Sequence, residues 1–491
     1  MGLEIDHTEF SEEEFRLFSK RLRANLQALR IMLDRPGFGE GDLSFGAELE
    51  LYIVDKEGRP LHVNQEIQRQ LNDPQLTLEL NRYNLEYNFS PCLLQDNCFQ
   101  HTQEEAESAI AKINACAAQW EGQVVPIGIL PTLEQSDTGY HAMTPLVRYQ
   151  ALTKELTEIR GGPFTINLEG EENLQLSMDD VTLEGANTSF QIHLRVPPQE
   201  FSDFYNAVQL VTPLVVAMAG NSPLLFGHRL WRETRIPLFK QSIDCRPKDS
   251  MHPIPARVNF GSNWIREGAF ELFAEATLLY RPILPENDVE DPVAVAKSGG
   301  TPHLHELRLH QGSIWWWNRP VYDPAGGGHL RIELRALPAG PSLIDMLANA
   351  ALAIGLARVM QPKISELLPA MPFTYCTANF YRAAQQGMEA ELFWPSLTQS
   401  QPEYYAVTDI LQELLPQIAE PLAGMGFQEG DFKPLISVLE ERLATQQTGA
   451  QWQLNKLAEL RKEMHKRDAL AAMLRQYQEN SARNIPVAQW K

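Results

Sequence analysis

The sequence predicts an α+β fold in which helices flank an antiparallel β-sheet. Two kinds of pattern support this prediction. Four segments alternate apolar and polar residues with a period of two, which is typical of strands with one buried face. Long segments before, between and after them repeat apolar residues at helical spacing. Since helical patterns alone follow residue 395, we expect a sheet-bearing domain of residues 1–395 and a helical C-terminal region of residues 396–491.

Local signals place the helices. Ser11 and Glu14 have the spacing of a capping box, which predicts that a helix begins there and runs to Leu33. Helical spacing returns over residues 104–120 and 201–220. A strongly apolar helix over residues 342–360 is expected to pack beneath the sheet as scaffold, without a chemical role.

Residues 283–302 contain prolines, glycines and acids without periodicity, which predicts a loop. Such a loop is either a mobile lid over a site or an inert surface connection, and the sequence favours neither.

Composition and charge limit the possible partners. The chain has 491 residues, of which 44% are hydrophobic, so it is long enough to bury a large core. It carries 63 acidic and 42 basic residues, a net charge of -21, and no Lys/Arg-rich block, which argues against a nucleic-acid partner. No signal peptide and no run of eighteen apolar residues is evident, so we expect no membrane partner. The five scattered cysteines fit neither a zinc motif nor a disulfide framework and indicate a cytoplasmic protein.

The first predicted strand carries two carboxylates on one face. From Phe45 to Ile53, alternation places the apolar residues on one side and Glu48 and Glu50 on the other. Three later segments repeat this design. Their polar sets are Asn84, Glu86 and Asn88; Gln191, His193 and Arg195; and Arg331, Glu333 and Arg335.

If the four strands share one sheet, their polar faces combine carboxylates, amides, a histidine and arginines. Carboxylate oxygens suit Mg²⁺ or Mn²⁺, and arginine suits phosphate or carboxylate oxygens, so the set fits ATP bound through metal ions. The alternative is a merely solvated sheet face, which is normal for any single strand. The absence of lysine from these positions favours the functional interpretation for the set.

Four motifs resemble those of the glutamate-cysteine ligase superfamily of carboxylate-amine ligases. They begin at Phe45 (Phe-Gly-Ala-Glu-Leu-Glu), Gly220 (Gly-Asn-Ser-Pro-Leu-Leu-Phe-Gly), Trp231 (Trp-Arg-Glu-Thr-Arg) and Ile332 (Ile-Glu-Leu-Arg-Ala-Leu-Pro), in the family's order. The resemblance implies a glutamine synthetase/guanido kinase-like sheet funnel, with residues 1–395 as the catalytic domain. It also implies a reaction in which ATP phosphorylates the γ-carboxylate of glutamate and an amine attacks the γ-glutamyl phosphate.

The resemblance also implies roles for individual residues. The expected metal ligands are Glu48, Glu50, Glu79, Glu86 and Glu333. Arg335 and Arg235 are the expected catalytic arginines, and Arg335 also contacts the phosphates. Gln191 stands where the family often has a metal-binding histidine, and His193 follows on the same face, so both are carried as cofactor-binding candidates.

Other candidates are weaker. His303, His305 and His310 lie near Glu306 but match no compact zinc motif, so we expect a surface or lid role for the cluster, with an approach of His310 to the funnel near the tryptophan run as the alternative. The tryptophans at residues 315–317 either stack on adenine or pack in the core. The chain contains no Gly-x-Ser-x-Gly elbow and no Walker A motif.

The leading hypothesis is therefore an ATP- and metal-dependent glutamate-cysteine ligase that acts in glutathione biosynthesis. Its partners would be ATP, glutamate and an amine such as cysteine. Two rivals remain: a related ligase with another amine or carboxylate, and a non-catalytic nucleotide-binding or scaffold protein. The sequence leaves the oligomeric state open.

Overall fold

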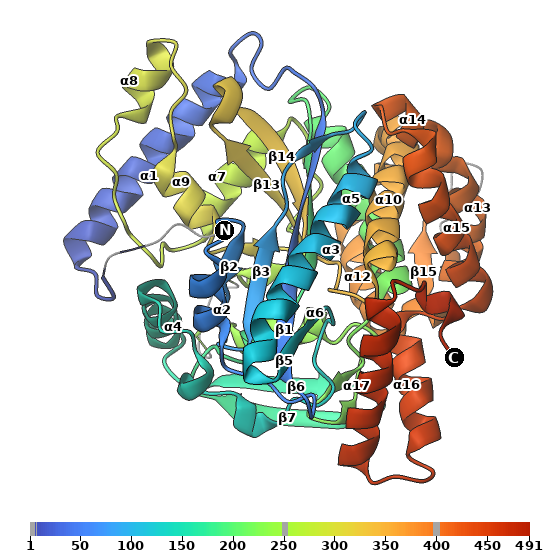
Figure 1. Ribbon diagram of the computed structural model, residues 1–491. Helices are drawn as coiled ribbons and strands as arrows, with labels where there is room; N and C mark the ends of the chain where they lie inside the picture. The colour runs from blue at the N-terminus through green and yellow to red at the C-terminus, as the bar shows by residue number, and fades with distance from the viewer. Residues whose placement is uncertain (1–4, 6, 248–253, 396–402) are drawn as a thin grey trace.

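The computed structural model describes residues 5, 7–247, 254–395 and 403–491. Its centre is an antiparallel sheet with the strand order β13-β14-β8-β1-β3-β2, to which β4 and β5 are added through β1 (Figure 1). The strands are β1 (Ser44–Asp55), β2 (Leu76–Leu78), β3 (Asn84–Asn88), β4 (Cys92–Leu93), β5 (Gly122–Val125), β8 (Phe190–Arg195), β13 (Asn318–Asp323) and β14 (His329–Leu334). The sheet curls into a half-barrel, and the predicted α+β class is confirmed.

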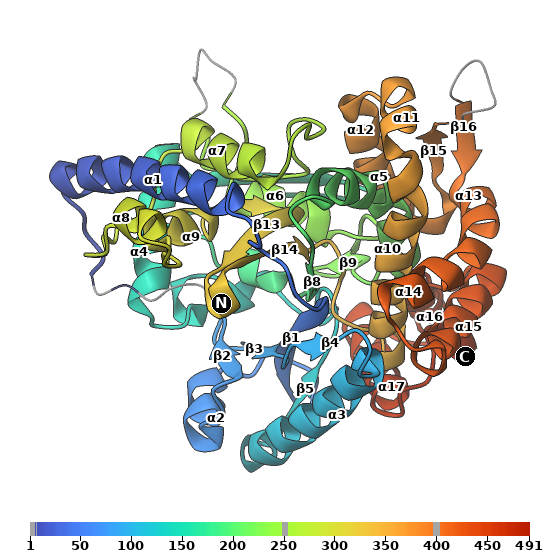
Figure 2. The same ribbon diagram turned by 90° about the horizontal axis from the view of Figure 1, so that it is seen from above.

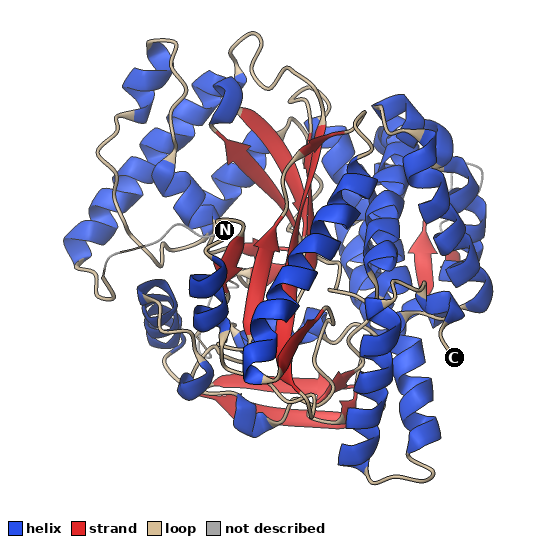
Figure 3. Ribbon diagram, viewed as in Figure 1, coloured by secondary structure: helices blue, strands red, loops and turns tan. Residues whose placement is uncertain are grey.

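Helices lie on both sides of this sheet (Figures 2 and 3). One group is α1 (Glu12–Leu33), α4 (Val147–Arg160), α7 (Ala269–Leu279), α8 (Pro292–Lys297) and α9 (His305–Gln311). The other side has α5 (Phe201–Ala219), α10 (Leu343–Met360) and α12 (Phe373–Gln386). In Figure 1, α2 (Asn64–Leu71) and α3 (Cys98–Ala117) lie in front of the sheet, whereas α6 (Arg235–Ser242) packs against the hairpin of β6 (Phe164–Glu169) and β7 (Asn173–Met178).

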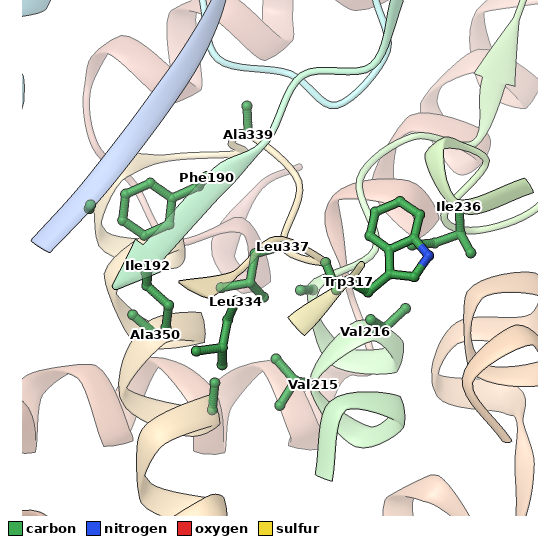
Figure 4. Close-up of a cluster of buried hydrophobic side chains, with 14 of the residues drawn as sticks. Phe190, Ile192, Val215, Val216, Ile236, Trp317, Leu334, Leu337, Ala339 and Ala350 are labelled. Atoms are coloured by element: carbon green, nitrogen blue, oxygen red, sulfur yellow. The ribbon is translucent and has the colours of Figure 1, made fainter. Parts of the chain in front are cut away.

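The apolar face of the sheet builds the core with α5 and α10 (Figure 4). Phe190 and Ile192 of β8 and Leu334 of β14 are buried there, together with Val215 of α5 and Ala350 of α10. Alternation along each strand directs the residues between these apolar positions to the opposite face. The core therefore fixes which face of the sheet carries the polar side chains.

The capping box and the apolar scaffold helix are confirmed. Ser11 Oγ accepts a hydrogen bond from the Glu14 backbone N–H, and the Glu14 carboxylate accepts one from the Ser11 backbone N–H. Among the described residues, the helical stretch Leu343–Ala370 is long and apolar enough to cross a membrane, but 89% of its apolar window is buried inside the fold. Packing against α5 accounts for its composition.

The C-terminal region is helical, as predicted. It contains β16 (Glu403–Ala406), which pairs with β15 (Glu391–Trp394), and then α13 (Val407–Leu414), α14 (Ala419–Met425), α15 (Glu429–Thr445), α16 (Gly449–Leu460) and α17 (Lys466–Ala482). In a buried ion pair, Arg442 of α15 contacts Asp345 of α10 at 2.6 Å. Tyr477 of α17 donates a hydrogen bond to the Pro126 carbonyl at 2.9 Å. These helices thus share a core with the sheet. The boundary expected after residue 395 falls at residues 396–402, which lie outside the described part of the chain.

Residues 283–302 form a surface connection with a short helix, α8, that the sequence did not reveal. Arg21 of α1 donates to the Glu290 carbonyl at 2.6 Å, and Arg35 donates to the Ala296 and Gly300 carbonyls. None of these residues lines the two cavities described below. The surface alternative therefore fits this segment better than a lid.

Candidate active site

The four predicted polar strands are neighbours in one sheet, and their registers bring the polar residues together. Glu50 of β1 lies opposite Glu86 of β3, and Glu48 lies opposite Gln191 of β8. His193 in turn lies opposite Glu333 of β14. The side chains that the sequence placed on one face of each strand therefore form a continuous polar surface across the sheet.

Three carboxylates converge at one end of this surface. Glu50, Glu79 and Glu86 each offer an oxygen, and these oxygens lie within 4.8 Å of one another. Burial and the charge of Glu86 raise the pKa of Glu50 to about 7, and burial and neighbouring acids also raise the pKa of Glu79 and Glu86. Buried carboxylates that repel one another favour either protons or a cation between them. Glu79, which lies just beyond β2, is thus brought to Glu50 and Glu86 as expected.

Neutral donors orient two of these carboxylates. Thr77 and Asn88 donate hydrogen bonds to Glu86 Oε1 at 3.0 and 2.9 Å. The backbone N–H of Ser189 donates to Glu50 Oε2 at 2.7 Å, and Gln191 Nε2 donates to Glu50 Oε1 at 2.9 Å. Hydrogen bonds of this kind fix carboxylate orientation around a metal site.

Gln191 also links the acidic cluster to the arginines, because its Oε1 accepts a hydrogen bond from Arg335. Arg335 pairs at the same time with Glu333. Arg319 of β13 contacts both oxygens of Glu333 through Nη2, at 2.9 and 2.6 Å. Burial opposes ionisation of Glu333, but the charges of Arg319 and Arg335 outweigh it and lower its pKa to about 2. Glu333 is therefore held as an anion between two arginines.

His193 lies beside two acids of the neighbouring strands, Glu48 of β1 and Glu333 of β14. Its Nε2 is 3.1 Å from Glu48 Oε1, and its side chain is only 9% exposed. Both ring nitrogens are buried and lack a hydrogen bond to the described residues, although Nε2 is within ion-pair distance of Glu48. A buried histidine with an open ring nitrogen beside two carboxylates can ligate a cation together with Glu48 and Glu333.

Arg235 is placed differently from the other predicted residues. It is the first residue of α6 and is buried, with Nη1 3.0 Å from Glu233 Oε1 and 3.3 Å from the Ala336 carbonyl. It does not line either cavity on the polar face. Its charge nevertheless opposes the rise in the pKa of Glu50, so Arg235 lies near the acidic cluster without lining the cavity.

Two cavities open on the polar face. The larger, of about 490 Å³, contains Glu48, the acidic cluster, Gln191 and Arg335. The smaller, of about 130 Å³, contains Glu48, His193 and Glu333 together with four arginines. These arginines are Arg148, Arg308, Arg319 and Arg331. Since both cavities include Glu48, Arg148 and Arg319, they form neighbouring parts of one site.

Sequence reasoning missed several cavity residues. Arg148 and Tyr149 reach the larger cavity from α4, and Glu184 reaches it from the short helical turn Glu184–Ala186. Arg319 follows the tryptophan run, and its position one residue into β13 could have been found from the alternation of Arg319, Val321 and Asp323. Nothing in the local pattern distinguishes Arg148 or Glu184 from surface residues.

The interpretation of the histidine cluster was wrong for one member. His310 of α9 is buried, not on the surface or in a lid, and its Nε2 lies 2.9 Å from the Ala276 carbonyl. Burial lowers the pKa of His310 to about 4. Of the tryptophans, Trp316 and Trp317 are core residues, while Trp315 is half-buried and lines the larger cavity.

A curled antiparallel sheet with carboxylates and arginines facing one cavity matches the class of carboxylate-amine ligases. The chain belongs to the glutamate-cysteine ligase family 2 (GCS2), whose model matches residues 44–476. No curated protein sequence matches it.

One solved structure supports the fold. A glutamate-cysteine ligase from Francisella tularensis, solved in complex with AMP, superposes with a TM-score of 0.50 at 11% identity. That match covers 91% of this chain and 90% of the other. A bifunctional glutathione synthetase from Pasteurella multocida gives a TM-score of 0.45 at 12% identity, covering 93% of this chain and 54% of that one.

Proposed function

We propose that the protein is an ATP- and Mg²⁺-dependent ligase that joins the γ-carboxylate of glutamate to an amine, with cysteine as the leading acceptor. The observation that carries the proposal is the meeting of three carboxylates, Glu50, Glu79 and Glu86, in a cavity that also contains Arg319 and Arg335. Membership of the glutamate-cysteine ligase family supports the class of reaction.

The donor set fits a divalent cation. Glu50, Glu79 and Glu86 supply hard oxygen donors. Their carboxylates repel one another, and among the described residues none of the three has an ion-pair partner, so a bound cation would offset the repulsion. Mn²⁺ would fit the same donors. A second cation would be held by Glu48, His193 and Glu333, where the open Nδ1 and the close approach of two acids favour it. When bound, such cations supply charge that offsets the negative charges of two anionic reactants.

The chain's own residues would divide the remaining work. Arg335 and Arg319, held in place by Glu333, present planar donors to a phosphoryl group and stabilise charge as it moves from ATP. Gln191 would position both Glu50 and Arg335, because its side-chain amide donates a hydrogen bond to Glu50 and accepts one from Arg335. Arg235, held by Glu233 and the Ala336 carbonyl, would act on the acidic cluster through its charge, which favours the ionised form of Glu50.

We also propose a division of the chain into a catalytic and a supporting part. Residues 1–395 would contain the catalytic site, and residues 396–491 would brace it through α15 and α17. A non-catalytic role is disfavoured, because a cavity lined by buried, unneutralised acids is costly to keep without a cation.

The test is mass spectrometry of the products formed from ATP, Mg²⁺, glutamate and a panel of amines that includes cysteine. We expect a γ-glutamyl amide together with equal amounts of ADP and phosphate. Formation of a different amide would show that the true amine or carboxylate substrate is not cysteine or glutamate. The absence of any amide-forming turnover would overturn the proposal.

A further inference from the structure

The larger cavity contains one acid that the proposed roles leave unused. Glu184 lies on the cavity wall in the turn that precedes β8. Its side chain forms no hydrogen bond or ion pair with the described part of the chain, whereas its backbone carbonyl accepts from Asn187. Glu184 thus brings a carboxylate without a described partner to the wall of the cavity in which a substrate would lie.

The turn that carries Glu184 is held firmly. The Glu184 backbone N–H donates to the Val181 carbonyl at 2.9 Å, and Tyr52 donates to the Ala186 carbonyl at 2.6 Å. At Gly185 a Cβ atom would lie 2.4 Å from the amide nitrogen of Asn81, so the backbone packs closely there. A side chain on such a support is positioned before substrate arrives.

The other acids of this cavity already have partners. Glu50 and Glu86 accept hydrogen bonds from Ser189, Gln191, Thr77 and Asn88, and Glu79 converges with them in the acidic cluster. Glu48 lies 3.1 Å from His193. Glu184 does not belong to the converging cluster, so among the described cavity acids it is the one left to act on a substrate amine.

The chemistry of amide formation requires such a group. An amine near neutral pH is an ammonium ion, whose nitrogen has no free electron pair to attack a carbonyl carbon. We propose that Glu184 is the general base of the acceptor half-reaction and binds the ammonium group of the incoming amine. This inference rests on the proposed function and names a residue and a step within it.

The Glu184 carboxylate takes one proton from the ammonium group, and the freed nitrogen attacks the carbonyl carbon of the acyl phosphate. The new C–N bond forms as the bond between that carbon and the phosphate oxygen breaks, and the departing phosphate takes the second proton from nitrogen. Burial and the charge of Glu50 raise the pKa of Glu184 to about 8, so its ionised form is a stronger base than an exposed carboxylate and its population rises as the pH approaches 8.

The variant Glu184→Gln tests this assignment by comparing two acceptors. Hydroxylamine is largely uncharged near neutral pH and needs no base, whereas the amine that gives the fastest wild-type turnover arrives as an ammonium ion. We expect kcat with that amine to fall by about 100-fold or more, and hydroxamate formation to stay near the wild-type rate. The remaining amide formation should rise with pH as the free amine fraction increases.

Three outcomes would overturn the inference. Equal losses with both acceptors would assign Glu184 to binding or phosphoryl transfer, and equal rates in variant and wild type would remove it from the site. Calorimetric titration with Mn²⁺ adds a readout independent of activity: a loss of affinity like that of Glu86→Gln would make Glu184 a metal ligand instead. Glu158→Gln, an exposed acid on α4, is the matched control. If the wild type forms neither hydroxamate nor amide, the proposed function itself fails.

Discussion

Glu50 and Glu86 lie directly opposite each other on the antiparallel strands β1 and β3, and on the cavity face Glu86 is buried and Glu50 half-buried. Like charges in this relationship destabilise a sheet, since cross-strand side chains are close neighbours. The fold keeps this pair at the centre of its sheet, with Glu79 as a third acid beside it. The arrangement becomes favourable when a cation lies among the three carboxylates.

This relationship predicts opposite effects of one substitution on stability and on cation response. Glu86→Gln should stabilise the metal-free protein by roughly 1 kcal/mol, because it removes cross-strand repulsion and keeps the hydrogen-bonding shape. The same variant should lose the rise in melting temperature that Mg²⁺ gives the wild type. Differential scanning fluorimetry with and without MgCl₂ measures both. A variant that still responds to Mg²⁺ like the wild type would contradict the assignment.

Glu333 is predicted to matter for stability as well as for activity. Glu333→Gln leaves Arg319 and Arg335 buried without their anion, so we expect a loss of about 3 kcal/mol in the free energy of unfolding. The double variant Glu333→Gln/Arg319→Gln should recover part of that loss without recovering turnover. Urea denaturation of both variants measures the difference. Equal stability of Glu333→Gln and the wild type would show that the three charges are not coupled.

The C-terminal helices are predicted to be required for folding of the sheet-bearing part. Arg442 and Asp345 are 1% and 0% exposed, and Asp345 also accepts a hydrogen bond from the Val487 backbone N–H. Arg442→Met leaves Asp345 buried without its partner, which should cost about 3–5 kcal/mol. Arg461→Met, on the exposed end of α16, is the matched control. Limited proteolysis that released a stable fragment of residues 1–395 would contradict this view.

His310 predicts a loss of stability in mild acid. Its pKa is about 4 in the folded protein, against an ordinary value of 6.5, because burial disfavours the charged ring. The neutral ring therefore contributes stability that is present above pH 6.5 and is lost as pH falls toward 4, at most about 3 kcal/mol. His310→Gln should flatten the dependence of unfolding free energy on pH in this range. An unchanged slope would contradict the prediction.

The strands of the polar face could be predicted from the sequence, because a sheet with one buried face requires apolar residues at every second position and this alternation is visible in each strand alone. It could not predict which residues meet across strands, since register depends on tertiary pairing. The Glu333–Arg319 pair and the Glu50–Glu86 pair both arise in this way. Arg148 and Glu184 come from a helix and a turn outside the sheet, where no periodic pattern marks a cavity residue.

Arg235 shows a different limit. Its motif resembles that of a substrate- or phosphate-binding arginine, and that role stays a prediction. Only the fold shows that Glu233 is within reach of its guanidinium group. His310 is similar: its surface assignment failed because a polar residue was judged by its type, while the helix turns it toward the core.

The central claim is that Glu50, Glu79 and Glu86 together hold a divalent cation. Calorimetric titration of Mn²⁺ into wild type, Glu86→Gln and the exposed control Glu158→Gln tests it most directly. The account predicts saturable binding to the wild type and to Glu158→Gln, with affinity at least about 10–100-fold weaker in Glu86→Gln. Equal Mn²⁺ affinity in all three proteins would contradict it.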